Sequence, residues 1–168
     1  VVAVSKEGDV SGHPAFVHVG RPAAARAAYA RALALLESPP LAGDTAFGTR
    51  RLRALVRERL GRMLQVLGDA RGARDTLARS LALREAVLAS RPGSVDARRD
   101  VAIAHFLLGD VLLEQGDAAG AAAHVAAALP VRLTLAREDT GNVMLVRGVA
   151  LTLGQQARVA RAAGDAGG

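Results

Sequence analysis

The chain of 168 residues contains no cysteine and no tryptophan, and aromatic residues make up only 2% of it. Without cysteine, neither a disulfide framework nor a zinc site with thiolate ligands can form. Strand-forming patterns are nearly absent too, whereas alanine, leucine and valine supply much of the 51% of hydrophobic residues. Because alanine has the highest helix propensity, this composition favours an all-α protein of one compact domain or a few stacked helical pairs.

The sequence also lacks a long, strongly apolar run. Its most apolar stretch, 118–131, is mostly alanine and contains His124 and Pro130, so it falls short of the roughly 18 apolar residues that a transmembrane helix needs. We therefore expect no membrane span here and a cytoplasmic location, although a parent protein could be anchored elsewhere. The chain begins Val1-Val2 with no charged segment or cleavage site, which indicates a fragment or processed piece rather than a signal-bearing precursor.

Lysine is scarce as well: Lys6 is the only one, so arginine supplies nearly all of the positive charge behind the formal net charge of +6. A basic chain can bind nucleic acid or anionic surfaces. Here the arginines are spread over every segment, and few aromatic residues lie between them to stack on bases. We interpret them as a solvated helix surface and do not expect nucleic acid as a partner. A basic, arginine-rich helical module that binds nucleic acid or anionic surfaces is the alternative.

An internal repeat of 48 residues organises the chain. One set of marks at this spacing is Gly20, Gly68, Gly116 and Gly164, and a second is Arg51, Arg99 and Arg147. Apolar residues recur at three- and four-residue spacing on both sides of each glycine, which predicts two amphipathic helices per unit. A helical unit repeated at a fixed period is typical of a solenoid.

The repeat predicts the organisation of the whole chain as a single repeat domain over 1–168. It comprises a partial unit at 1–40, full units at 50–91 and 94–138, and an unpaired last helix at 142–163. Ser94, Asp69 and Asp117 stand where a side chain can cap a helix N-terminus. Pro130 lies inside a helix, where it removes one backbone hydrogen bond and should bend the axis.

The units resemble the tetratricopeptide repeat. Its small and large positions are matched in the best unit by Leu108-Gly109, Leu112, Gly116, Ala121, Val125 and Ala128, and one period earlier by Leu60-Gly61, Leu64, Gly68, Ala73, Leu77 and Ser80. The period of 48, longer than the usual 34, implies lengthened helices. The resemblance implies a right-handed solenoid of antiparallel helix pairs.

The stretches DARRDVAIAHF and LGDVLLEQGDAAGAAAHVAAALPVR also look like the repeat region of bacterial serine/threonine protein kinases. This likeness implies a non-catalytic regulatory or scaffolding region. A transcription regulator or a protease could carry such repeats instead.

Motifs for catalysis are missing. The chain has no glycine-rich phosphate loop, H-R-D or D-F-G, and Ala104 stands where the lysine of a kinase V-A-I-K strand would be. His13 and His18, with Asp9 nearby, supply too few ligands for a structural zinc site. His105 occupies a packing position, and His124 is expected to cover an alanine-rich surface. We therefore expect no enzymatic activity, metal or cofactor in this chain.

The tetratricopeptide resemblance places a partner-binding groove on the first helix of each unit. Carried over by position, its exposed residues are Glu58, Arg62, Gln65, Phe106, Asp110, Leu113, Arg158 and Arg161. The lysine and asparagine pattern that clamps a peptide C-terminus in chaperone-binding members does not occur at these positions. We expect a protein or peptide in this groove. The unpaired last helix predicts self-association, or continuation into further sequence, because stacked repeats need capped ends.

Overall fold

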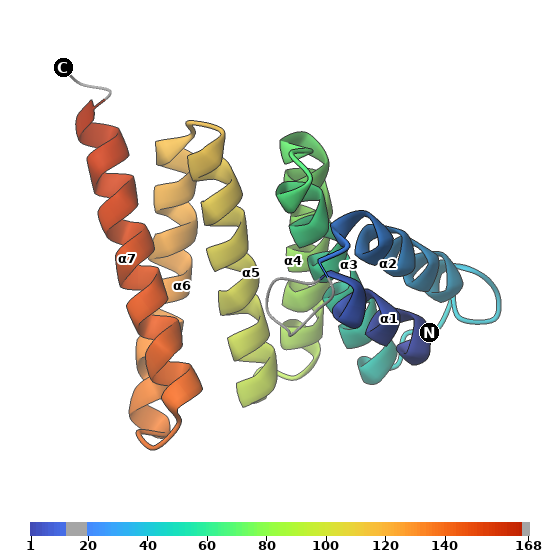
Figure 1. Ribbon diagram of the computed structural model, residues 1–168. Helices are drawn as coiled ribbons and strands as arrows, with labels where there is room; N and C mark the ends of the chain where they lie inside the picture. Colours follow the sequence, from blue (N-terminus) through green and yellow to red (C-terminus); the bar gives the residue numbers. More distant parts are fainter. Residues whose placement is uncertain (13–19, 166–168) are drawn as a thin grey trace. The chain divides into compact units, whose positions relative to one another are not determined.

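The protein is all-α, as expected, in the computed structural model, which describes residues 1–12 and 20–165. Seven helices and no strand occur in these residues. The helices are α1 (Val2–Gly12), α2 (Pro22–Glu37), α3 (Phe47–Val66), α4 (Ala70–Ser90), α5 (Val95–Glu114), α6 (Ala118–Glu138) and α7 (Val143–Asp165) (Figure 1).

The 48-residue period predicted from the sequence reappears in the positions of the helices. The helices α3, α5 and α7 begin at Phe47, Val95 and Val143, and α2, α4 and α6 begin at Pro22, Ala70 and Ala118. Each start therefore lies 48 residues after the preceding one of its set. From α3 to α7 the helices are 20 to 23 residues long, which agrees with the lengthened helices that the period implies.

Three of the four glycines at the 48-residue spacing have a backbone conformation that favours glycine. Gly20, Gly68 and Gly116 have positive φ angles of 70°, 81° and 79°, which glycine adopts at little steric cost. Gly68 and Gly116 each follow a helix end and allow the chain to reverse into the next helix, and Gly20 lies just before the start of α2. Gly164 differs, because it lies inside α7.

The predicted capping side chains accept hydrogen bonds at helix N-termini. Ser94 accepts one from the Ala97 N–H at 3.2 Å, and the first turns of α4 and α6 are capped in the same way by Asp69 and Asp117, at 2.9 and 2.7 Å. These contacts set the starts of three helices. The helix α6 continues through Pro130.

The bounds of α3 and α7 differ from the expected ones, and α7 also begins one residue later, at Val143 rather than 142. The helix α3 begins at Phe47 rather than Arg50, because Asp44 accepts hydrogen bonds from the Ala46 N–H and the Thr49 hydroxyl, at 2.8 and 2.6 Å. The helix α7 extends to Asp165, past the expected end at residue 163. Local side-chain contacts of this kind shift helix ends without changing the repeat.

The helices fall into two compact units, Val1–Val87 (unit 1) and Leu88–Gly168 (unit 2). In unit 1, α1 packs on α2 and α2 on α3. Its core contains Ala25, Tyr29, Ala32, Leu36, Val56 and Met63. The close packing of α1 on α2 requires a glycine at position 8, because the Tyr29 ring would lie 2.6 Å from a Cβ added there.

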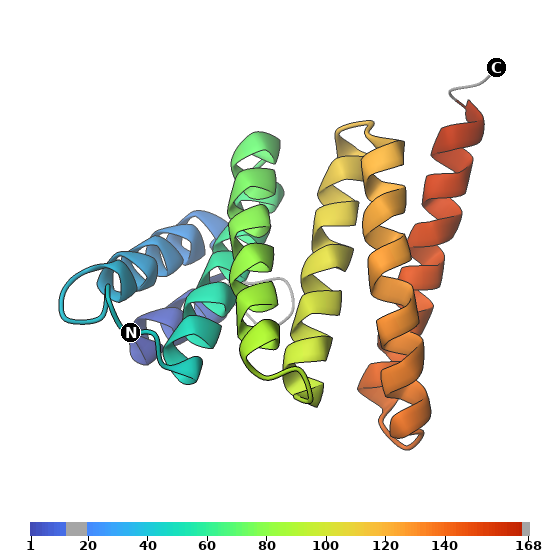
Figure 2. The same cartoon turned by 180° about the vertical axis from the view of Figure 1, so that it is seen from behind.

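In unit 2, α5, α6 and α7 lie side by side, and each contacts the other two (Figures 1 and 2). The core there includes Leu112, Ala121, Val125 and Val159. The helix α6 is long and apolar enough to cross a membrane, judged by length and composition alone. The expectation that no segment is long and apolar enough for a membrane span is therefore wrong for α6. One such helix is weak evidence of a membrane span; 28% of its apolar window is buried, and Ala121 and Val125 belong to the core of unit 2.

Candidate functional site

The eight expected groove residues are divided between the two units. Three lie on α3 in unit 1, namely Glu58, Arg62 and Gln65, and five lie on α5 and α7 in unit 2, namely Phe106, Asp110, Leu113, Arg158 and Arg161. One continuous groove through all eight residues therefore stays a prediction.

In unit 1, the expectation that Glu58 is an exposed groove residue is wrong. Glu58 is only 8% exposed, and its carboxylate forms an ion pair with Arg84 of α4, which is 4% exposed. Arg62 lies 4.0 Å from the same carboxylate and, like Gln65, is half-buried. Glu58 thus joins α3 to α4, and its charge is satisfied inside unit 1.

In unit 2, three of the expected residues are gathered around Gln155 of α7. The buried Gln155 amide donates hydrogen bonds to the Phe106 carbonyl at 2.8 Å and to the Asp110 carboxylate at 3.0 Å. Arg158 forms an ion pair with the same carboxylate. Phe106 and Asp110 are half-buried rather than exposed. Gln155 was not among the residues predicted from the sequence, although a polar residue on the inward face of an apolar helix indicates a buried hydrogen bond.

The remaining expected residues of unit 2 line a shallow pocket between the C-terminal parts of α5 and α7. Its volume is about 320 Å³, and its lining consists of Leu113, Glu114, Arg158, Arg161 and Ala162. Leu113 is half-buried, while both arginines are exposed, as expected. This part of the α5–α7 surface combines two cations with a small apolar area.

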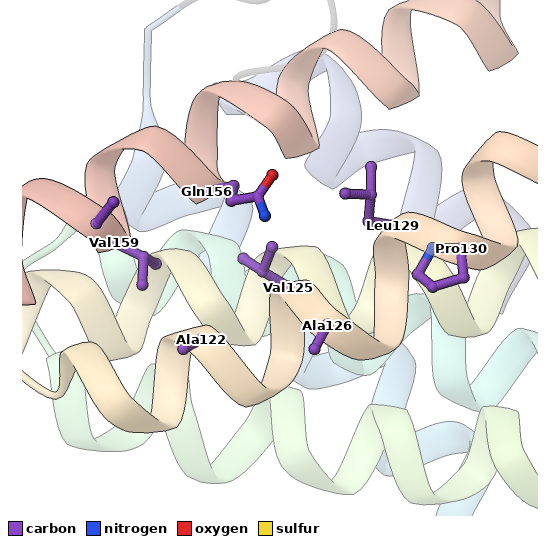
Figure 3. Close-up of a pocket in the computed structure, with 8 residues that line it drawn as sticks. Ala122, Val125, Ala126, Leu129, Pro130, Gln156 and Val159 are labelled. Carbon is purple, nitrogen blue, oxygen red and sulfur yellow. The ribbon is translucent and has the colours of Figure 1, made fainter.

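A second pocket, of about 300 Å³, lies between α6 and α7 (Figure 3). Its lining is apolar except for Gln156 and includes Val125, Leu129 and Pro130 of α6 and Val159 of α7. Figure 3 shows Gln156 on the α7 side of this space. With one neutral amide and no charged side chain, the pocket can bind apolar groups but has nothing to orient an ionic ligand.

A third pocket combines apolar walls with a buried cation. Its volume is about 280 Å³, and its lining residues come from α5, α6, α7 and the connection before α7, namely Arg99, Ile103, Arg132, Leu135, Asn142, Met144, Leu145 and Gly148. Arg132 is 8% exposed and lies over the Phe106 ring, with its guanidinium carbon 4.8 Å from the ring centroid. Burial lowers the pKa of Arg132 to about 10, opposed by the charge of Asp110, so the side chain is still a cation at neutral pH.

Two histidines meet between α5 and α6. The Nδ1 atoms of His105 and His124 are 2.9 Å apart, and both rings are half-buried. His124 therefore packs against α5 rather than covering an alanine surface as expected. Burial, and then the charge of His105, lower the pKa of His124, while Asp117 acts in the opposite direction. His13 and His18 lie outside the described residues, and the described residues contain no group of three metal-binding side chains.

The histidine pair leads to a pH prediction. A histidine with a lowered pKa in the fold resists protonation, so its contribution to stability is complete above pH 6.5, its ordinary pKa, and is lost as the pH falls below it. We expect the unfolding free energy of unit 2 to fall between pH 7 and pH 5, measured by urea unfolding followed by circular dichroism. The His105→Leu variant should show a smaller loss, and an equal loss in both proteins would contradict this role of the pair.

Comparison with known proteins gives no identification: no family model matches the chain, and a search of curated proteins finds no match.

Proposed function

We propose that this chain is a protein-interaction module built from tetratricopeptide-type helical repeats. Support comes from the 48-residue spacing of the helix starts and from the positive φ of Gly20, Gly68 and Gly116. The tetratricopeptide pattern at Leu60-Gly61 and Leu108-Gly109 adds to it. Repeat modules of this kind stack helices on helices, and proteins bind along the faces that stacking leaves open.

The observation that carries the proposal is an exposed apolar stripe on α7. It consists of Val143, Val146, Ala150, Leu153, Ala157 and Ala160, spaced by three and four residues. Val143, Val146 and Leu153 are 75%, 50% and 46% exposed. Since helical residues at this spacing share one face, the stripe is a continuous surface onto which an amphipathic helix can pack.

The internal repeat shows what kind of element fits this stripe. Forty-eight residues before Ala150 and Leu153 stand Ala102 and His105 of α5, and that face of α5 is covered by α6: Ala102 is 1% exposed and His105 contacts His124. In unit 1, the equivalent face of α3 is covered by α4, because the Ser80 hydroxyl donates to the Ala54 carbonyl at 2.7 Å. We infer that α7 receives a helix in the same way, supplied by a partner protein or by a second copy.

A second part of the proposal concerns the larger protein to which these repeats belong. The likeness of DARRDVAIAHF and the following helix pair to the repeats of bacterial serine/threonine kinases leads us to propose a regulatory, non-catalytic region of such a kinase. In that role the repeats would hold substrates or regulators near a catalytic domain elsewhere in the parent.

A photo-crosslinking amino acid at position 153 tests the proposal in cells that produce the protein. We expect crosslinks from position 153 to another polypeptide and few from position 127, an exposed alanine of α6. Adducts of twice the chain mass would identify a second copy, and other masses a partner. Equal labelling from both positions, or none from either, would show that α7 is not a docking surface.

A further inference from the structure

The two units place arginines at equivalent positions in different surroundings. Arg84 of α4 and Arg132 of α6 are 48 residues apart, and so are the α3 and α5 residues that they contact, Glu58 and Phe106. In unit 1, Arg84 has a carboxylate partner, because Glu58 forms an ion pair with it. In unit 2, a phenyl ring takes the place of that carboxylate, and Arg132 lies over it.

Arg132 therefore keeps a buried positive charge without a carboxylate partner among the described residues. Its Nη1 atom donates hydrogen bonds to the Gly148 carbonyl at 2.5 Å and to the Thr152 hydroxyl at 2.8 Å. Both acceptors are neutral, and no described residue accepts from Nε or Nη2. A buried charge normally requires an opposite charge or a full set of hydrogen bonds, so Arg132 retains capacity for an anion.

The nearby charged side chains already have partners of their own. Asp110, the carboxylate that acts on the pKa of Arg132, is held by Arg158 and Gln155. At the pocket, Arg99 lies 2.8 Å from Asp96 and 4.0 Å from Asp100. Among the lining residues, Arg132 is thus the charged group that is not neutralised within unit 2.

We propose that the pocket around Arg132 binds a small organic carboxylate with an unbranched apolar chain. The guanidinium of Arg132 receives the carboxylate through its Nε and Nη2 donors, a pairing that matches its planar geometry. Ile103, Leu135 and Leu145 line the walls around the hydrocarbon chain. This binding site is independent of the stripe on α7 and does not rest on the protein-interaction proposal.

The size of the pocket narrows the class of acid. A volume of 280 Å³ corresponds to about nine water molecules at roughly 30 Å³ each. This space has room for a medium-chain monocarboxylate such as octanoate. Because the walls carry no second unneutralised cation, a monoanion is favoured over a dianion.

Octanoate, octanol and octylammonium are the probes for this site, with binding to the full chain measured by calorimetry. They share one chain and differ in head-group charge. We expect octanoate to bind and octanol to bind about 10- to 100-fold more weakly, the usual contribution of charged hydrogen bonds. Octylammonium should not bind measurably. Equal affinity for octanoate and octanol would show non-specific apolar binding and overturn the proposal.

Two variants test the role of Arg132 itself. Arg132→Met removes the cation but keeps most of the apolar volume, and Phe106→Glu gives Arg132 the internal counter-ion that Glu58 gives Arg84. Both should weaken octanoate binding at least tenfold while retaining the helical circular dichroism of the wild type. Undiminished binding by a folded Arg132→Met chain would place the acid elsewhere.

A third variant tests the pocket at an exposed position, because substitutions at the buried Arg132 and at Phe106 could unfold unit 2. Met144 lines the pocket but is 67% exposed, so Met144→Trp can be accommodated and should obstruct the pocket. We expect it to lose octanoate binding, whereas Met144→Ala should retain it. Undiminished binding by the tryptophan variant would count against this pocket.

Discussion

Replacing Glu58 by alanine is expected to destabilise unit 1 by about 3–5 kcal/mol, the usual cost of removing one partner of a buried ion pair. Arg84 would be left 4% exposed and without the Glu58 carboxylate. The tyrosine fluorescence of the chain reports on this unit, because Tyr29 is the only tyrosine and lies in the unit 1 core. Urea unfolding followed by this signal measures the loss, since stability falls linearly with denaturant.

Glu7 provides the matched control for the Glu58 experiment. It pairs with Arg31 at 2.8 Å, and the two side chains are 57% and 54% exposed, so this exposed ion pair should contribute only about 0–1 kcal/mol. We expect Glu7→Ala to shift the urea midpoint only slightly. A similar small shift for Glu58→Ala would mean that other groups stabilise the buried charge of Arg84. Arg84 and Arg132 would then not differ in their dependence on a carboxylate partner.

The parts of the fold that sequence analysis predicted correctly depend on local interactions. Helix starts at Ala70, Val95 and Ala118 follow from a capping side chain one residue earlier. The chain reversals follow from glycine, because positive φ is costly for other residues. Each of these signals acts within a few residues, so one sequence is enough to detect them.

The candidate sites were predicted less well, because periodicity assigns a residue to a position but not to a partner. Glu58 and Phe106 share one repeat position, which the resemblance treated as groove surface in both units. The structure instead pairs Glu58 with Arg84 and Phe106 with Arg132, each 26 residues further along the chain. Comparing charges at this separation would have indicated one internal ion pair and one arginine without a counter-ion.

The first helix shows a second limit of sequence analysis. The repeat assigned residues 1–40 only to a partial unit, whereas the structure has a helix that runs through Gly8 and carries a buried polar residue, Asp9. Asp9 accepts a hydrogen bond from the Tyr29 hydroxyl at 2.7 Å and pairs with Arg59 at 2.8 Å. These contacts join residues 20 and 50 positions apart, and no pattern within α1 indicates them.

Tyr29→Ala should therefore be among the most damaging substitutions in unit 1. The side chain is fully buried, and replacing a buried aromatic residue by alanine costs about 3–5 kcal/mol through lost burial and the remaining cavity. Tyr29→Phe keeps the ring and removes only the hydrogen bond to Asp9, so it should cost about 1–3 kcal/mol. Urea unfolding followed by circular dichroism gives both values, because the variants lack the fluorescent tyrosine.

The ionisation of Tyr29 tests the same contact without a substitution. Burial, followed by the hydrogen bond to Asp9, raises the pKa of Tyr29 far above its ordinary value of 10.0. Since the fold favours the neutral phenol, its contribution to stability is complete below pH 10 and is lost as the pH rises further. In an alkaline titration, phenolate absorbance should appear only as unit 1 unfolds. Ionisation near pH 10 in a folded chain would show that the hydroxyl reaches water, which the contact with Asp9 does not allow.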